Sequence, residues 1–237
     1  MIRVFPDPAA ALSALAERIV SEAGGAIALR GEFRIALSGG TTPVTLYRML
    51  ASAAWRERIE WSRCVLLFAD ERAVPVGDAD RTDRLVREML LEPLALDVTG
   101  LRSMRAESED LDAAALEYEE QVRLPIDLLL LGAGPDGHIA SLFPHAPALT
   151  ESVRRVVAVT ASPKPPPRRI TLTPRAIGEA RSVCVLALGE GKSNAVSRAL
   201  DPATSAQECP AALVRDRDWY IDAAAAARRG EGHPHRA

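Results

Sequence analysis

The amino-acid sequence predicts an α/β fold in which an open, mostly parallel sheet is covered by helices on both faces. Short apolar runs that end in turn signals alternate along the 237-residue chain with stretches of helical periodicity. Such alternation is typical of α/β proteins. The runs are apolar throughout, as expected for strands buried on both faces of a parallel sheet.

The first helix is predicted in "DPAAALSALAERIVSEAGG", residues 7–25. Leucine, isoleucine and valine recur on one helical face of this segment. Asp7 suits the N-cap, Pro8 suits the first helical position, and Gly24 with Gly25 predicts the end of the helix.

Five apolar runs predict the strands: "FRIALSGG" (33–40), "CVLLFADER" (64–72), "IDLLLLGAG" (126–134), "RRVVAVTAS" (154–162) and "SVCVLALGEG" (182–191). Helices are predicted in "TPVTLYRMLASA" (42–53), "TDRLVREMLL" (82–91), "SEDLDAAALEYEEQV" (108–122), "TPRAIGEA" (173–180) and "GKSNAVSRAL" (191–200). The proline-rich "SPKPPPRR" (162–169) predicts a stiff extended loop. With no composition shift to mark a boundary, we expect one domain over residues 1–226 and a flexible tail over 227–237.

The composition favours a cytoplasmic protein. The formal net charge is −3, with 29 basic and 32 acidic residues spread along the chain, so neither a nucleic acid nor a membrane is indicated as a partner. The three cysteines have no disulfide or metal spacing, which suits a reducing compartment. No apolar run approaches the ~18 residues that span a bilayer. The chain is expected to be a monomer or a small homo-oligomer.

In open α/β sheets ligands bind at the carboxyl ends of the strands. The first run ends in "LSGGTTP", in which Gly39 and Gly40 let the backbone approach an anion and Thr41 and Thr42 add hydroxyls at a helix start. This pattern predicts a phosphate site, and the alternative is a capped turn that needs glycine. It is not a P-loop, because no lysine follows the glycines.

Cations come after three further runs. Arg72 lies in "FADERAVP", Arg169 follows the proline-rich loop, and Lys192 lies in "LGEGK". Each could be an ordinary surface residue. At the same sheet edge as an anion site, however, arginine and lysine predict a phosphate monoester as ligand.

The third run ends in "GAGPDGH" (132–138), which fits the G-x-G-x-x-G spacing of a dinucleotide site. Such a site needs a helix after the third glycine and an acid at the end of the next strand. That strand stops at Thr160 without an acid, and Asp136 would repel a pyrophosphate. We therefore expect no NAD and no other cofactor.

The same turn instead exposes His138 with Asp136 beside it. A histidine titrates near neutrality and can act as a general base towards water, with a carboxylate to orient it. The alternative is a histidine that only caps the next helix, and His145 is a less constrained candidate base. No pair of histidines has metal-ligand spacing, so we expect no metal.

The segments "LSGGTTP", "FADERAVP", "DLLLLGAGPDGHIASLFP", "PKPPPRRITLTPRAI", "LALGEGK" and "CPAALV" together resemble the 6-phosphogluconolactonases of the glucosamine-6-phosphate isomerase/6-phosphogluconolactonase superfamily. They span residues 37–214 in the family's order. The resemblance implies a Rossmann-like fold without a nucleotide cofactor. It also implies hydrolysis of 6-phospho-D-glucono-1,5-lactone, the second step of the oxidative pentose phosphate pathway.

By this resemblance His138 is the base with Asp136 beside it, and Arg72 completes a positive cleft. The implied phosphate contacts are Gly40, Thr41, Thr42, Arg169 and Lys192. Two loops depart from the family pattern. Thr82 and Asp83 stand where a Ser-Asn pair is usual, and His145 stands where a glycine is usual, so the contacts made there are left open.

Two other functions compete with lactone hydrolysis. A glucosamine-6-phosphate deaminase would share the anion site and "DGH", but it typically has an Asn-Glu-Pro after "DGHIA", where the glutamate assists the histidine. Here the loop reads "SLFP", with no acid before Glu151. A non-catalytic sugar-phosphate sensor would normally carry a DNA-binding segment, for which the chain shows neither room nor a basic patch.

Overall fold

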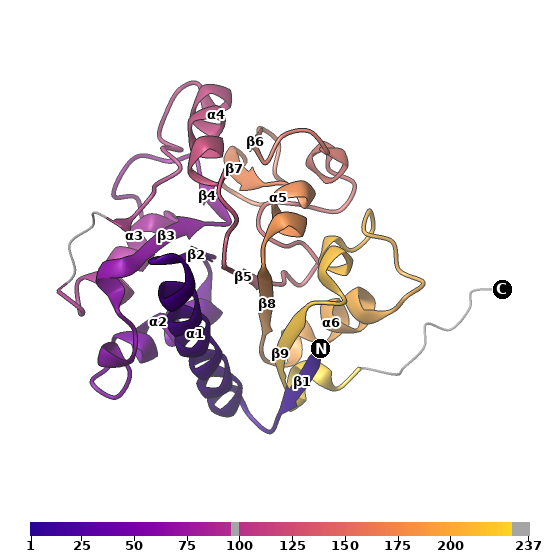
Figure 1. Ribbon diagram of the computed structural model, residues 1–237. Coiled ribbons are helices and arrows are strands. Elements are labelled where there is room, and N and C mark those ends of the chain that lie inside the picture. The colour runs from indigo at the N-terminus through magenta and orange to yellow at the C-terminus, as the bar shows by residue number, and fades with distance from the viewer. Residues whose placement is uncertain (96–99, 229–237) are drawn as a thin grey trace.

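The computed structural model describes residues 1–95 and 100–228, built around two β-sheets (Figure 1). The larger sheet has six strands in the order β1-β9-β8-β5-β2-β3, and every neighbouring pair runs parallel. Its strands are β1 (Ile2–Phe5), β2 (Phe33–Leu37), β3 (Cys64–Phe68), β5 (Leu128–Gly132), β8 (Ser182–Ala187) and β9 (Asp218–Asp222). The smaller sheet is antiparallel and consists of β4 (Asp70–Arg72), β7 (Arg169–Leu172) and β6 (Val156–Val159).

The α-helices are α1 (Pro8–Arg30), α2 (Thr41–Ala51), α3 (Thr82–Val86), α4 (Leu111–Gln121), α5 (Pro174–Glu179), α6 (Ser193–Leu200) and α7 (Ala223–Ala226). A π-helical turn, Arg87–Leu91, extends α3. Short 3₁₀ turns lie at Arg56–Arg58, Trp61–Arg63, Pro147–Thr150, Glu190–Lys192 and Pro210–Val214.

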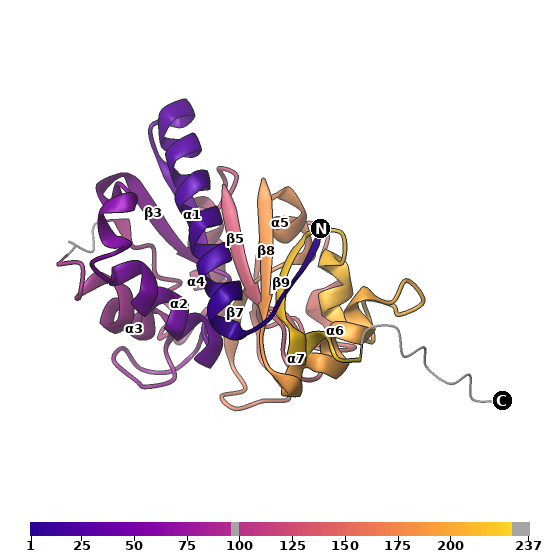
Figure 2. The ribbon, with the colours of Figure 1, turned by 90° about the horizontal axis from the view of Figure 1, so that it is seen from below.

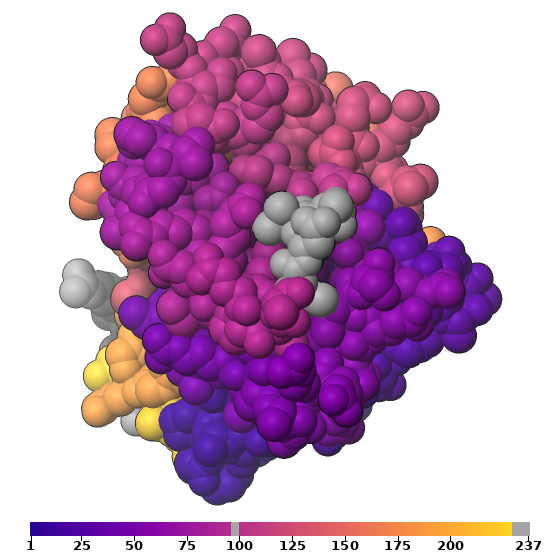
Figure 3. All heavy atoms as spheres, turned by 90° about the vertical axis from the view of Figure 1, so that its left-hand side faces the viewer, coloured from indigo at the N-terminus to yellow at the C-terminus, as the bar shows by residue number. Residues whose placement is uncertain are grey.

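Helices cover both faces of the parallel sheet, as the sequence predicts. Helices α1 and α2 lie on one side of it, whereas α4, α5 and the small sheet lie on the opposite side (Figures 1 and 2). Seen from the β3 end, most of the surface belongs to the first half of the chain, and the second half appears at the edges of this face (Figure 3). The buried apolar side chains of both sheets and their helices form one cluster, which extends along the chain from Leu12 to Ala225.

Four of the five predicted strands are confirmed in the parallel sheet. The prediction that the fifth run belongs to the same sheet is wrong. The run at 154–162 forms β6, which pairs with β7 in the antiparallel sheet. Strand β7 itself begins where only a loop was predicted, and edge strand β1 and its neighbour β9 were not predicted. Apolarity marks a buried strand but does not show which sheet buries it.

The predicted end of the first helix at Gly24 and Gly25 is also wrong, because α1 continues to Arg30. Ala23 and Ala26 are buried on both sides of the glycine pair, so packing outweighs the cost of about 1 kcal/mol for a glycine inside a helix. Helix α1 ends instead at Gly31, whose φ of +81° is the left-handed conformation of a C-cap.

Strand β2 lies between β3 and β5. The chain adds β3 on one side of β2 and later adds β5 on the other side, so the direction in which strands are added reverses at β2. Ligands of open α/β sheets bind at such a switch point. Within residues 1–95 and 100–228, no helix is long and apolar enough to cross a membrane. The predicted tail falls mostly on residues 229–237, which lie outside the described residues.

Candidate active site

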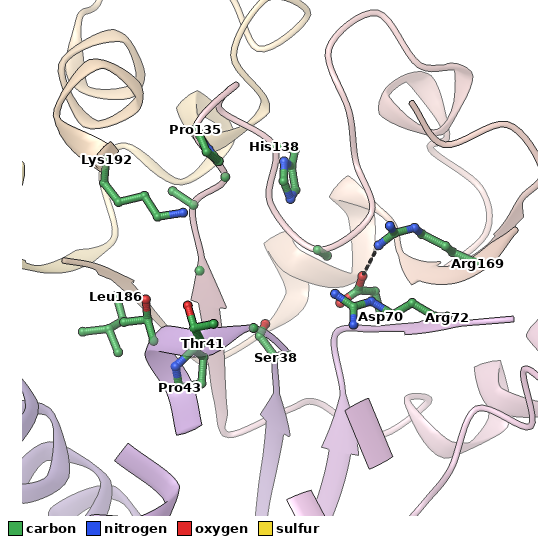
Figure 4. A pocket seen from close by; sticks show the side chains of 17 residues that line it. Ser38, Thr41, Pro43, Asp70, Arg72, Pro135, His138, Arg169, Leu186 and Lys192 are labelled. Carbon is green, nitrogen blue, oxygen red and sulfur yellow. Dashed lines mark ion pairs between the residues drawn. The ribbon is translucent and has the colours of Figure 1, made fainter. Parts of the chain in front are cut away.

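A pocket opens at the carboxyl ends of β2, β5 and β8, at this switch point (Figure 4). Eight of the nine predicted site residues line it: Gly39, Gly40, Thr41, Thr42, Arg72, His138, Arg169 and Lys192. The ninth, Asp136, is hydrogen-bonded to His138. The fold therefore brings together residues that are more than 150 positions apart in the sequence.

The loop after β2 has the form of an anion-binding turn. Gly40 has a φ of +106°, a conformation that favours glycine, and α2 begins directly after it without a side-chain cap. The first N–H groups of α2 are thus free for a ligand. Ser38 fixes this loop to the neighbouring strand, because its hydroxyl donates to the carbonyl of Leu130 over 2.8 Å.

The "GAGPDGH" segment forms a tight turn after β5. The N–H of Gly134 donates to the carbonyl of His138 over 2.8 Å, and the N–H of Gly137 donates to the carbonyl of Gly134 over 2.9 Å. No α-helix begins there: the next helical element of the described chain is the 3₁₀ turn Pro147–Thr150. The motif therefore lacks the helix N-terminus on which a dinucleotide site depends, and His138 is not a helix cap.

His138 is held by a carboxylate and an aromatic ring. Its Nδ1 lies 2.5 Å from Oδ1 of Asp136, and its ring lies 4.7 Å from that of Phe143, centroid to centroid. Nζ of Lys164 donates to the same Asp136 oxygen over 2.9 Å. Burial alone would raise the pKa of Asp136, but the hydrogen bonds from His138 and Lys164 outweigh it and hold that pKa well below its usual range.

The short contact determines which tautomer of His138 the site favours. Asp136 is ionised and can only accept, so the proton between the two residues belongs to Nδ1 of the imidazole. The lone pair of the neutral ring is then on Nε2. His138 thereby has the arrangement of a general base, with its orienting carboxylate behind it.

The three charges of "DER" divide into two buried acids and one pocket cation. Glu71 is fully buried, and its carboxylate accepts the N–H groups of Arg72, Thr82 and Asp83, each over 2.8 Å. Burial raises the pKa of Glu71 to about 7. Asp70 is also buried and accepts the hydroxyl of Ser141 over 2.6 Å. Asp70 and Arg72 line the pocket, whereas Glu71 does not, and Arg72 adds a positive charge to the pocket wall (Figure 4).

Arg72 and Arg169 are cross-strand neighbours, because β4 and β7 pair in the register that sets them opposite each other. Arg169 is buried, and most of its donors are already used. Nε donates to the carbonyl of Pro166 over 3.0 Å, and Nη2 donates to those of Lys164 and Pro165 over 3.2 Å. Its Nη1 lies 3.4 Å from the Ser141 hydroxyl. Nη1 also forms an ion pair with Oδ2 of Asp70 over 3.9 Å (Figure 4). Both contacts of Nη1 are longer than those of Nε and Nη2, so Nη1 is the nitrogen of Arg169 that the protein holds least closely.

Lys192 enters the pocket from the side opposite to Arg72 and Arg169, with His138 between them (Figure 4). Within the described residues its amine has no hydrogen-bond or ion-pair partner. Burial and then the positive charge of Lys164 lower the pKa of Lys192. An anion in the pocket would offset both effects.

The two departures from the family pattern lie outside the pocket. The Thr82 side chain packs against Gly39, where a methyl group would stand 2.7 Å from the threonine hydroxyl. Asp83 forms a paired contact with the buried guanidinium of Arg81. His145 has a φ of +60°, a left-handed conformation that explains why glycine suits this position.

Lys164 is the residue of this cluster that the sequence analysis missed. In the sequence, "PKPPPRR" predicts only a stiff loop and a phosphate contact from Arg169. A lysine just before a rigid proline run, in a loop that ends at the same sheet edge, was the available signal. Among the described residues, no group of three or more His, Cys, Asp or Glu side chains is placed to hold a metal ion.

Comparison with known proteins gives a consistent picture. A family model described as glucosamine-6-phosphate isomerases/6-phosphogluconolactonase matches residues 6–221. A 6-phosphogluconolactonase of Mycobacterium tuberculosis is 41% identical over 96% of this chain and 97% of its own length. The structure of 6-phosphogluconolactonase from Trypanosoma brucei has a TM-score of 0.81 at 28% identity, covering 96% of this chain and 98% of that one. A monomeric glucosamine-6-phosphate deaminase, also with a TM-score of 0.81, is only 22% identical over 96% of this chain and 99% of its own, which shows the fold alone.

Proposed function

The chain belongs to the family of glucosamine-6-phosphate isomerases and 6-phosphogluconolactonases, and we propose that it hydrolyses 6-phospho-D-glucono-1,5-lactone to 6-phospho-D-gluconate. It is an enzyme of this family, and its curated relatives support hydrolysis of a lactone as the reaction. One observation carries the finer proposal. His138, oriented by Asp136, lies in the same pocket as a glycine-rich anion site and Lys192, whose amine has no partner among the described residues.

In the proposed reaction His138 acts first as a base and then as an acid. Nε2 takes a proton from water while the water oxygen attacks the lactone carbonyl, which gives a tetrahedral oxyanion and an imidazolium. Arg72 and the N–H groups of the glycine turns are the candidate donors to that oxyanion. The bond from the carbonyl carbon to the ring oxygen then breaks, and the imidazolium returns its proton to the leaving alkoxide.

The phosphate would lie at the start of α2. There Gly39, Gly40, Thr41 and Thr42 offer N–H groups and hydroxyls, and the helix dipole favours negative charge. Lys192 supplies a charge from the opposite wall, and Arg169 adds one through Nη1. Holding the phosphate in this way would place the lactone ring between the anion site and His138.

The deaminase alternative is weakened by the loop after His138. The first acid beyond that histidine, Glu151, accepts the N–H groups of Val153 and Arg154 with its carboxylate. It is not among the residues that line the pocket. The reaction would therefore lack the second acid that assists the histidine in that branch of the family. Release of ammonia from glucosamine 6-phosphate would restore this alternative.

The proposal is tested by comparing hydrolysis of 6-phosphogluconolactone with that of unphosphorylated gluconolactone. We expect kcat/KM to be higher for the phosphorylated lactone by about 100-fold or more, because several charge-assisted hydrogen bonds bind the phosphate. Initial rates on freshly prepared lactones, corrected for spontaneous hydrolysis, measure this ratio. Equal rates on both lactones would contradict the phosphate site, and no turnover of either would contradict the proposed function.

Replacing Lys192 with alanine is expected to raise KM for 6-phosphogluconolactone roughly 10- to 100-fold and to change kcat much less. The reason is that the amine has no protein partner within the described residues and would bind the phosphate equally in the ground and transition states. Unphosphorylated gluconolactone is the control, and its kcat/KM should stay nearly unchanged. A fall in kcat at constant KM would instead assign Lys192 to the chemical step.

A further inference from the structure

Lys164 makes a contact that none of the proposed catalytic steps uses. Its Nζ donates to Oδ1 of Asp136 over 2.9 Å and lies 3.2 Å from Nδ1 of His138. Because Nδ1 already donates its own proton to Asp136, it cannot also accept one from the lysine. The ammonium group therefore bonds the carboxylate, and one oxygen of Asp136 receives both charge-assisted hydrogen bonds.

The backbone of Lys164 is fixed independently of that contact. Its carbonyl accepts the hydroxyl of Ser162 over 2.9 Å and Nη2 of Arg169 over 3.2 Å, and its N–H donates to the same hydroxyl. Ser162 in turn donates its N–H to the carbonyl of Pro167 over 2.8 Å. Because these bonds set where the lysine backbone lies, its side chain starts from a fixed point beside Asp136.

We propose that Lys164 is a positioning residue, which holds Asp136 ionised and in place so that His138 keeps its Nδ1 proton and presents Nε2 to the pocket. Without the ammonium group, the carboxylate loses one of its two hydrogen-bond donors and is free to turn away from the imidazole. His138 would then populate the opposite tautomer, in which Nε2 carries a proton and cannot act as a base.

The two lysines of the region have separate roles in this proposal. Lys192 lines the pocket, and its amine has no partner in the described part of the chain. Lys164 is not among the lining residues, and its ammonium group donates to Asp136. Removing Lys192 should therefore act on KM, and removing Lys164 should act on kcat. The catalytic half of the inference rests on the proposed lactonase function, and the effect on the tautomer of His138 does not.

The test compares Lys164→Met with Lys164→Arg. The methionine side chain is unbranched, like the aliphatic part of lysine, and carries no charge. Because the lysine side chain is 38% exposed, its replacement leaves no buried cavity. We expect kcat on 6-phosphogluconolactone to fall about tenfold in Lys164→Met with KM within twofold of the wild type, and to recover partly in Lys164→Arg. The control is Arg168→Met in the same loop, because Arg168 points away and donates to the carbonyl of Glu109.

Nitrogen-15 NMR of the imidazole supplies a readout that does not depend on turnover. The wild type should show His138 as the Nδ1–H tautomer, and Lys164→Met should show a mixture of tautomers. Unchanged imidazole signals together with unchanged kcat would overturn the proposal. A rise in KM at constant kcat would also overturn it, by making Lys164 a substrate contact. A wild type that hydrolyses no lactone would refute the proposed function, and the imidazole spectra would still decide the role of Lys164.

Discussion

Replacing His138 with alanine is expected to lower kcat for 6-phosphogluconolactone by about 10²- to 10⁴-fold, the range typical of a general base. Asp136 bonds to its ring over 2.5 Å and leaves Nε2 as the free nitrogen, and within the pocket lining His138 is the single imidazole. KM should change little, because the phosphate contacts lie at the start of α2 and on the opposite walls. Initial rates above spontaneous hydrolysis, measured across a range of lactone concentrations, separate the two constants.

His145→Ala is the matched control for this experiment. It removes the same side chain seven positions further along the chain, from a residue that does not line the pocket. Its kcat should stay within about twofold of the wild type. Asp136→Asn should fall between the two, because an amide can donate to Nδ1 and so favour the unproductive tautomer. If His138→Ala kept full activity, the assignment of the base would be wrong.

The sequence was sufficient for four of the six strands of the large sheet, because a continuous apolar run marks a buried strand within the strand itself. The runs of β2, β3, β5 and β8 are apolar at nearly every position, and each one leads into a turn with glycine or charge. Strand β7 escaped prediction because "RITL" begins with an arginine and follows a proline run. What makes it a strand is its pairing with β4 and β6, and pairing between distant segments leaves no local signal.

The roles of the charged residues of the site also depend on contacts between distant segments, which the sequence does not show. Asp70, Glu71 and Arg72 look alike in the sequence, although both acids are buried and only Asp70 and Arg72 line the pocket. Glu71 tolerates burial because the N–H groups of Thr82 and Asp83, the first residues of α3, donate to its carboxylate. The contact between Lys164 and Asp136 likewise joins two loops that are 28 positions apart.

Gly134→Ala is expected to lower kcat by about 100-fold while leaving the fold intact, and it addresses what the glycines of "GAGPDGH" are for. A methyl group at this position would overlap Nδ1 and Cε1 of His138 and stand 2.7 Å from Oδ1 of Asp136. The imidazole must then move away from its carboxylate, and a displacement of about 1 Å is enough to cost roughly 10²-fold in rate. Gly134 does not have a positive φ, so an alanine suits its backbone. The thermal midpoint of unfolding should therefore change far less than kcat.

Gly132→Ala separates this steric effect from a general need for glycine. Gly132 belongs to the same motif, but a methyl group there meets nothing within 4 Å, so the imidazole NMR signals of His138 should stay as in the wild type. In Gly134→Ala those signals should shift together with the loss of kcat. Equal losses of kcat in both variants would indicate that the whole turn must lack side chains so that a ligand can approach its backbone. A loss confined to Gly134 means that this glycine is there to make room for the catalytic pair, because the space it leaves empty is the space that the ring of His138 occupies.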